Sequence, residues 1–168
     1  MRAGLALGSN LGDRLRNLIE AHRAILALAN IQQPVKVSPI YETAPVNLER
    51  GAGAFLNAVM EVEFDGQPIV LLDDLQMIEA RMGRPSKRPR NASRAIDIDI
   101  LYVGNLVLKN NEVVIPHPRL HQRHFVLAPL NDIRPELLLP GQQRTVGELF
   151  ADLPGKNAVE VFRKDWVP

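Results

Sequence analysis

Apolar positions switch between two periods along the N-terminal part of the chain, and each switch predicts a new element. In residues 3–7 apolar side chains alternate with others, which predicts a strand. Over residues 13–29 they recur every three or four positions, as expected for an amphipathic helix with His22 on its apolar stripe. Residues 35–43 predict a second strand, and because Pro39 interrupts it we expect an edge or bulged strand.

The same two periods then repeat. Residues 55–64 alternate clearly, since every second position from Leu56 to Phe64 is apolar. Helical spacing returns over residues 68–82 and ends at Gly83, and residues 95–103 predict a fourth strand. The order strand–helix–strand–strand–helix–strand is typical of a ferredoxin-like α+β fold, with an antiparallel sheet and both helices on one of its faces. The opposite face is expected to be free for a ligand.

The remaining residues predict a C-terminal extension of helices and a strand. A turn at Gly104 leads into a short strand over residues 106–108, helices are expected over 119–131 and 145–153, and a last strand over 159–162. The chain shows no internal repeat and no linker of distinct composition. We therefore expect one domain over residues 1–168.

Composition excludes several classes of protein. Of the 168 residues, 46% are apolar and 23% charged, the usual mix of a soluble globular domain. The absence of cysteine excludes disulfides, thiolate metal sites and a cysteine nucleophile. No apolar run approaches the roughly 20 residues that cross a bilayer, and the N-terminus lacks a signal-like apolar segment. We expect a cytoplasmic protein with no membrane partner.

The stretch "SRAIDIDILY" (93–102) places two carboxylates where a buried strand is predicted. Alternation puts Asp97 and Asp99 on one face, and two like charges so close together need a cation between or beside them. Mg²⁺ suits such a pair, although an isolated D-x-D is common and a pair that is simply bridged to arginines remains open. By the same alternation, Phe55 and Asn57 lie on this face.

The net charge is only +1, but positive charge is concentrated just before the two aspartates. Six basic residues and no acidic ones lie between Arg81 and Arg94. Such a segment points to a local anionic ligand rather than a broad nucleic-acid surface. Arg84, Arg90 and Arg94 can clamp phosphates that a carboxylate-held Mg²⁺ bridges.

Other motifs are less specific. Residues 8–12, "GSNLG", lack the ending of a phosphate-binding Walker A loop, so a tight strand-to-helix turn and a ligand-contact role both stay open. Spacing alone makes Gln76 and Glu79 ordinary surface residues. The three histidines of "IPHPRLHQRH" (115–124) lack acidic or cysteine partners nearby, so zinc is not predicted, and His117 better fits a phosphate donor.

Five motifs together resemble the 6-hydroxymethyl-7,8-dihydropterin pyrophosphokinase family of folate biosynthesis. They are "ALGSNLGDR" (6–14), "YETAP" (41–45), "FLNAV" (55–59), "RAIDIDIL" (94–101) and "IPHPRLHQRHFVLAPL" (115–130), and they span nearly the whole chain. The resemblance implies a ferredoxin-like core and transfer of the terminal diphosphate of ATP to the hydroxymethyl oxygen of the pterin, releasing AMP. It implies small-molecule substrates and no nucleic-acid partner, and a monomer is the working expectation.

The resemblance also implies roles for individual residues. Asp97 and Asp99 hold two Mg²⁺ ions, and Arg84 and Arg94 stabilise charge on the transferred group. The backbones of Thr43, Ala44 and Val46 contact the pterin, Phe55 and Phe125 sandwich its ring, and Asn57 bonds its edge. The implied ATP contacts are Gln76, Glu79, Lys87, Ile100, His117 and Arg123, joined by Arg90 from the basic segment.

The chain departs from many members at residues 91–93, where Asn-Ala-Ser replaces a Trp-Gly-Pro run whose tryptophan can cap the pterin. Two rival functions also stay open. A ferredoxin-like RNA-binding module could use the basic segment 81–94, but it calls for exposed aromatics where this chain has aspartates. A non-catalytic nucleotide sensor on the same fold is the second, and the presence of both aspartates and both arginines argues against it.

Overall fold

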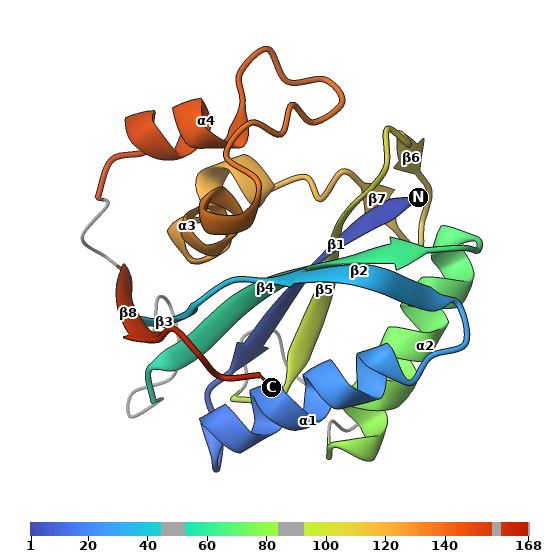
Figure 1. The fold of residues 1–168 in the computed structure, drawn as a ribbon, viewed down its shortest axis with the longest axis vertical. Coiled ribbons are helices and arrows are strands. Elements are labelled where there is room, and N and C mark those ends of the chain that lie inside the picture. The colour runs from blue at the N-terminus through green and yellow to red at the C-terminus, as the bar shows by residue number, and fades with distance from the viewer. Residues whose placement is uncertain (45–52, 84–92, 156–158, 168) are drawn as a thin grey trace.

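A computed structural model describes residues 1–44, 53–83, 93–155 and 159–167, and it contains the predicted antiparallel sheet (Figure 1). The strands lie in the order β5 (Asp97–Val103), β1 (Arg2–Ser9), β4 (Phe55–Phe64), β3 (Ile40–Thr43) and β8 (Val159–Arg163), and β2 (Ile31–Val37) also pairs with β4. A separate hairpin joins β6 (Leu108–Lys109) to β7 (Val114–Ile115). The ferredoxin-like order of the core is therefore confirmed.

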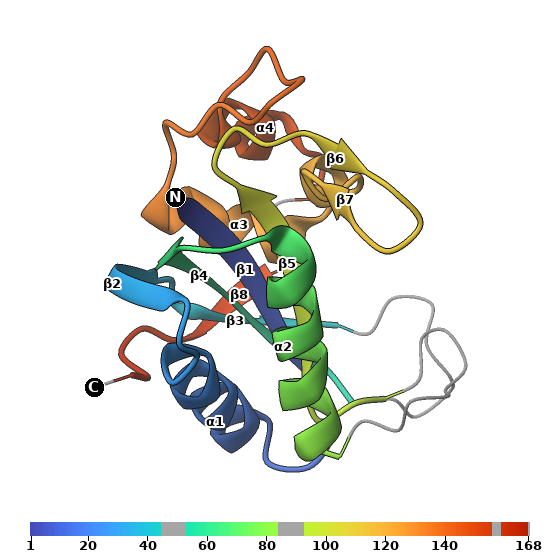
Figure 2. The ribbon, with the colours of Figure 1, turned by 90° about the vertical axis from the view of Figure 1, so that its right-hand side faces the viewer.

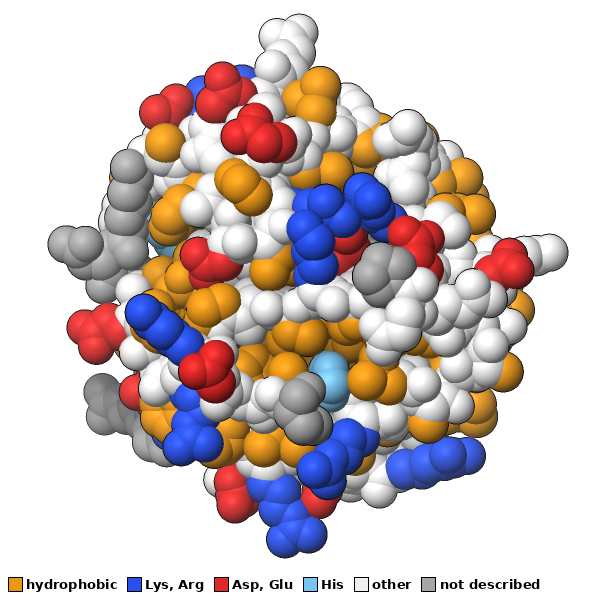
Figure 3. Space-filling model, viewed as in Figure 1, with side chains coloured by type: hydrophobic (Ala, Val, Ile, Leu, Met, Phe, Trp, Pro, Cys, Tyr) orange, Lys and Arg blue, Asp and Glu red, His pale blue; other side chains and the backbone are white. Residues whose placement is uncertain are grey.

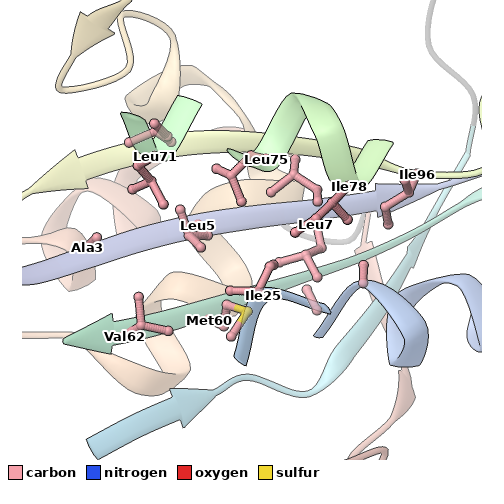
Figure 4. Close-up of a cluster of buried hydrophobic side chains, with 14 of the residues drawn as sticks. Ala3, Leu5, Leu7, Ile25, Met60, Val62, Leu71, Leu75, Ile78 and Ile96 are labelled. Carbon is pink, nitrogen blue, oxygen red and sulfur yellow. The ribbon is translucent and has the colours of Figure 1, made fainter. Parts of the chain in front are cut away.

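Two helices, α1 (Arg14–Leu26) and α2 (Pro68–Arg81), cover one face of the sheet as predicted. Figure 4 shows Leu75 and Ile78 of α2 over Leu5 and Leu7 of β1, with Ile25 of α1 beside the sheet. The alternation predicted in β4 is confirmed, because its even-numbered apolar residues from Leu56 to Phe64 are all buried in this cluster. Removal of the apolar surface of these side chains from water is the main force that holds the helices and the sheet together.

The second predicted strand is in fact two strands, and the break falls at Ser38 and Pro39. The backbone N–H of Ser38 donates to the Val59 oxygen at 2.9 Å, and the Ser38 hydroxyl accepts from the Val59 N–H at 2.9 Å. The prediction of an edge strand holds for β2, which pairs with β4 alone among the described strands. For β3 the edge alternative is wrong, because β8 covers its other side, but the bulged alternative holds, since the register of β3 with β8 shifts between Ile40 and Tyr41.

The expectation that the second face of the sheet is free is wrong for part of that face. The helices α3 (His124–Ile133) and α4 (Val146–Asp152) pack there, over a second cluster that contains Val59 and Leu101. Figure 2 shows these helices and the β6–β7 hairpin gathered toward one end of the molecule, away from α1. The end of the sheet where β5 begins remains outside this cluster.

An irregularity in the pairing of β5 with β1 brings two consecutive residues of β5 into the second cluster, under α3 and α4. The register with β1 shifts between Gly4 and Leu5, so Leu101 and Tyr102 both join the second cluster although they are consecutive. A side chain at Gly4 would lie 2.2 Å from a ring carbon of Tyr102, so the tyrosine lies directly across β1 at this point. In β5 the predicted alternation of side chains between the two faces of the sheet therefore holds up to Ile100 and fails at Leu101 and Tyr102.

The C-terminal elements are close to those predicted. The helix expected over 119–131 is a short 3-10 turn, η1 (Leu120–Gln122), followed by α3, because Arg123 between them is extended with φ −115° and ψ 109°. Helix α4 begins with a capping box between Thr145 and Glu148. None of the helices formed by the described residues has the length and apolar content of a membrane span.

Candidate functional site

The candidate site lies where β5 begins, beside the ends of β1 and β4. In the antiparallel register Gly8 of β1 faces Asn57 on one side and Asp97 on the other, while Ala6 faces Asp99. Residues that face each other across antiparallel strands project from the same side of the sheet. The two aspartates and the asparagine therefore share the face that α1 and α2 leave uncovered, as the alternation predicted.

Gly8 makes room for this arrangement. An added Cβ there would lie 3.3 Å from Oδ1 of Asn57 and 3.9 Å from a ring carbon of Phe55. Gly8 therefore places no side chain against the Asn57 amide or the Phe55 ring.

The aspartates are paired with arginines. Nη1 of Arg94 lies 2.8 Å from Oδ1 of Asp97, and Nη1 of Arg123 lies 3.6 Å from Oδ2 of Asp99. The side chain of Asp97 is 24% exposed and that of Asp99 is 42% exposed, so both carboxylates remain within reach of a ligand. Nε of Arg94 is buried and has no hydrogen-bond partner among the described residues.

Three of the predicted pterin contacts, Thr43, Phe55 and Asn57, lie together at the neighbouring strand ends. Thr43 of β3 faces Phe55 of β4, and Nδ2 of Asn57 donates to Oγ1 of Thr43 at 2.9 Å within the protein interior. Phe55 is partly exposed, Ala44 is exposed, and Phe125 at the start of α3 is 36% exposed. The guanidinium of Arg123 lies over the Phe125 ring, 5.5 Å from its centre, which links this aromatic residue to the aspartate pair.

Four of the predicted nucleotide contacts lie on or beside β5, which is an edge strand of the sheet: Glu79, Ile100, His117 and Arg123. Glu79 of α2 is 5% exposed, and its Oε1 accepts from the backbone N–H of Ile98 at 2.7 Å, between the two aspartates in sequence. Ile100 is buried on the side of the sheet that faces α2. Gln76 is exposed on α2. Glu79 therefore ties α2 to the strand that carries both carboxylates.

His117 lies on the open edge of β5, because its backbone N–H donates to the Leu101 oxygen at 2.8 Å. Burial, then the charges of Arg123 and Arg119, lower the pKa of His117 to about 4. Its Nδ1 accepts from the Arg119 N–H at 3.2 Å. The ring is therefore neutral at pH 7 with its proton on Nε2, which can donate to a ligand oxygen.

Several predicted residues lie outside the part of the chain that the structure describes. These are Val46, Arg84, Lys87 and Arg90, and the departure at residues 91 and 92. The prediction that His22 belongs to the core is confirmed, since it is 6% exposed and its ring meets that of Trp166 edge-on at 5.7 Å.

Asn10 is not among the residues predicted to form the site, but the structure brings it there. Asn10 is 5% exposed and bonds to Ser93 and Arg94, far away in sequence. Nothing but its place in the "GSNLG" turn could have pointed to it.

A separate hollow of about 510 Å³ lies at the opposite end of the sheet. It is lined by residues such as Arg2, Lys36, Glu61 and Arg134, and none of the predicted site residues reaches it. The chemistry predicted from sequence therefore belongs to the sheet surface near Gly8 and not to this hollow.

The described residues include no group of three or more His, Asp or Glu side chains that could hold a metal unaided. A pair of carboxylates still fits Mg²⁺, which takes one or two protein carboxylates and completes its shell with water and phosphate oxygens. Both aspartates are bridged to arginines, which is the alternative that the sequence left open, so Mg²⁺ binding stays a prediction. On the face seen in Figure 3, basic, acidic and apolar side chains are mixed, and one compact group of Lys and Arg stands near the centre.

Fold and site together define a ferredoxin-like α+β protein with an acidic, arginine-paired ligand site at one end of its sheet. Residues 4–135 match the family model described as 7,8-dihydro-6-hydroxymethylpterin-pyrophosphokinase. The chain belongs to this family of pyrophosphokinases, as the sequence motifs indicated.

Named relatives agree with this assignment. The 2-amino-4-hydroxy-6-hydroxymethyldihydropteridine pyrophosphokinase of Haemophilus influenzae is 39% identical over 141 residues, which cover 84% of this chain and 86% of that protein. The protein of the same name from Bacillus subtilis is 41% identical over 131 residues, or 78% of this chain and 77% of its own length. The folic acid synthesis protein FOL1 of Dictyostelium discoideum is 37% identical, covering 89% of this chain but only 22% of that longer protein.

Solved structures support the fold. The HPPK-DHPS of Plasmodium falciparum, crystallised with pterin and p-hydrobenzoate, superposes with a TM-score of 0.66 at 18% identity, over 89% of this chain and 44% of that one.

Proposed function

We propose that this protein transfers the terminal diphosphate of ATP to the hydroxymethyl oxygen of 6-hydroxymethyl-7,8-dihydropterin, giving AMP and the pterin diphosphate in folate biosynthesis. The single observation that carries the proposal is the common face of Asp97, Asp99 and Asn57. Carboxylates suited to Mg²⁺ and an amide suited to a heterocycle thus meet on one surface. The substrate brings its own nucleophile, so the lack of cysteine is no obstacle.

The phosphate side of the site would depend on Asp97 and Asp99. Together they would hold two Mg²⁺ ions with the triphosphate, and bound Mg²⁺ would neutralise charge on the phosphate oxygens and lower the pKa of the attacking hydroxyl. Arg94 and Arg123 already lie against the carboxylates, within reach of an arriving phosphate chain. The Nε–H of Arg94, which has no partner within the described part of the chain, and the Nε2–H of neutral His117 would donate to phosphate oxygens.

The pterin side would use the Asn57–Thr43 pair. Because an N–H of Asn57 is already given to the Thr43 hydroxyl, the amide oxygen is the group left to accept from a ring N–H. Phe55 and Phe125 would hold the flat ring between them, with the backbones of Thr43, Ala44 and Val46 at its edge. Such fixed alignment supplies most of what phosphoryl transfer requires of a protein.

The remaining assignments belong to the same proposal. Gln76, Glu79, Lys87, Arg90 and Ile100 would contact ATP, and Arg84 would join Arg94 at the transferred group. An RNA-binding role is disfavoured because the open face carries carboxylates, which repel phosphates without a cation. A cytoplasmic monomer formed by one domain over residues 1–168 stays a prediction.

An assay for AMP tests the proposal. The protein is incubated with ATP and 6-hydroxymethyl-7,8-dihydropterin, with Mg²⁺ or with EDTA. We expect AMP and pterin diphosphate in equal amounts, only with both substrates and only with Mg²⁺. Hydrolysis of ATP without the pterin, or no AMP at any Mg²⁺ concentration, would contradict the proposed reaction.

A further inference from the structure

Asn10, in the turn that follows β1, holds both backbone polar groups of Arg94. Its backbone N–H donates to the Arg94 oxygen at 3.2 Å, and its side-chain Oδ1 accepts from the Arg94 N–H at 2.8 Å. Its Nδ2 donates to Oγ of Ser93 at 3.2 Å. Three hydrogen bonds from one residue thus fix the position at which the basic segment enters β5.

The turn that carries Asn10 is itself held in place. Nδ2 of Asn17 on α1 donates to Oγ of Ser9 at 3.2 Å and to the Leu11 oxygen at 2.8 Å. Ser9 is fully buried and lies in β1, opposite Leu56 of β4. Asn10 is therefore attached to a helix and to the end of an inner strand of the sheet, and it can act as a fixed support.

The consequence concerns the Arg94 side chain. An arginine side chain carries about 2 kcal/mol of rotamer entropy, so its guanidinium is well placed only when its backbone is also held. With the backbone clamped, Nη1 reaches Asp97 at 2.8 Å and Nε stays buried without a partner among the described residues. A donor with no internal partner can serve a ligand at that point.

We propose that Asn10 is a positioning residue that acts on the reaction through Arg94, by holding its backbone so that the guanidinium faces the transferred phosphate. This inference rests on the proposed function and on the role of Arg94 in it. It assigns the "GSNLG" turn a purpose other than direct ligand contact, because the amide of Asn10 is occupied by Ser93 and Arg94.

Four variants separate positioning from a general structural role. Asn10→Ala removes both side-chain bonds, whereas Asn10→Asp keeps the oxygen that accepts from Arg94 and loses the donor to Ser93. Ser93→Ala loses that same Ser93 bond from the other side, and Arg94→Ala removes the residue through which Asn10 is proposed to act. We expect Asn10→Ala to lower kcat about 10- to 100-fold with KM nearly unchanged, since misplacement by about 1 Å costs up to that much. Asn10→Asp and Ser93→Ala should each lose less than about fivefold, or about 1 kcal/mol.

A thermodynamic cycle gives the decisive comparison. If Asn10 acts through Arg94, then Asn10→Ala has little further effect on kcat in an Arg94→Ala background, because the two changes remove the same interaction. If the losses in the single variants multiply in the double variant, Asn10 acts independently of Arg94 and the proposal is wrong. An unchanged kcat in Asn10→Ala would also overturn it.

Amide hydrogen exchange tests the clamp in the unaltered protein, without substrates and without regard to whether a variant folds. The Arg94 N–H should exchange at least about tenfold more slowly than in an unstructured peptide. Free exchange at Arg94 in the unaltered protein would overturn the clamp while leaving the proposed reaction intact. A protected Arg94 in a protein that makes no AMP would instead overturn the reaction, and with it the positioning role.

Discussion

Nη1 of Arg94 lies 2.8 Å from Oδ1 of Asp97, three residues further along the chain, so a cation already occupies one side of the carboxylate pair. Arg123 approaches Asp99 in the same way from a distant part of the chain, at 3.6 Å. In the proposed reaction these guanidinium groups and Mg²⁺ compete for the same oxygens. Arrival of the nucleotide would offer the arginines phosphate oxygens in exchange.

Neutralising Asp97 should remove Mg²⁺-dependent turnover. We expect Asp97→Ala to lower the rate of AMP release by more than about 100-fold, because a ligand of the ion that carries the phosphate charge is lost. The fold should survive, since the side chain is 24% exposed and outside both apolar clusters. Rates come from the AMP assay and folding from circular dichroism. Normal turnover in a folded Asp97→Ala variant would remove Asp97 from the mechanism.

Removing Arg94 should have opposite effects on metal binding and on turnover. In the absence of nucleotide, Arg94→Ala frees Asp97 from a competing cation, and a partly exposed ion pair is worth up to about 1 kcal/mol. We therefore expect Mn²⁺, measured by electron paramagnetic resonance, to bind up to about fivefold more tightly while AMP formation falls. Weaker Mn²⁺ binding in this variant would show that Arg94 supports the metal site instead of competing for it.

A side chain at Gly8 should impair pterin binding more than stability. In Gly8→Ala the new Cβ would lie 3.3 Å from Oδ1 of Asn57, so the amide must shift by a few tenths of an ångström. We expect the KM for the pterin to rise about tenfold, equivalent to about 1.4 kcal/mol, with the KM for ATP nearly unchanged.

Gly53→Ala is the matched control, because its Cβ would meet the Asn10 oxygen at an ordinary 3.5 Å. If both glycine variants raise the pterin KM equally, the contact with Asn57 does not explain the effect.

The neutral state of His117 should appear as a pH dependence of stability. Its folded pKa is lowered to about 4 by burial and by Arg123 and Arg119, below the unfolded value of about 6.5. Between these two pH values the unfolded chain binds more protons, so His117 contributes stability that is complete above pH 6.5 and is lost as the pH falls toward 4.

Urea denaturation at several pH values, with and without His117→Gln, measures this contribution. The free energy of unfolding of the unaltered protein should fall more steeply below pH 6.5 than that of the variant. Equal slopes, or a midpoint for His117 near 6.5 in an NMR titration, would contradict it.

The other end of the sheet should affect stability without affecting turnover. The buried Tyr102 hydroxyl donates to Glu61, which also accepts from Arg134. Tyr102→Phe leaves the carboxylate with one donor fewer in a buried place, which should lower the free energy of unfolding by about 1–3 kcal/mol. The rate of AMP release at 25 °C should stay within about twofold, since none of the predicted site residues lines this region.

Tyr41→Phe provides the comparison, because it removes the exposed bond from Tyr41 to Asp132 at 2.7 Å and should lower stability by less than about 1 kcal/mol. Equal losses in the two tyrosine variants would show that burial of Glu61 does not set the difference.

Much of this architecture can be read from local pattern. Alternation in residues 55–64 and helical spacing in residues 68–82 are physical consequences of burying one side of each element, so they survive as β4 and α2. Alternation also placed Asp97, Asp99 and Asn57 on one face, and the register of β1 with its two neighbours agrees. The metal and phosphate chemistry was suggested by composition around these strands.

The tertiary structure alone decided what lies over that face and what holds Arg94. The cover by α3 and α4, the shift that brings Leu101 and Tyr102 to one side, and the bonds of Asn10 to Arg94 all join segments far apart in sequence. A periodic pattern records which side of an element is buried, but it carries no information about which distant segment buries it. A single hydrogen bond, such as the one between Asn10 and Arg94, produces no periodic pattern in the sequence, because it depends on one geometry that only the folded chain creates.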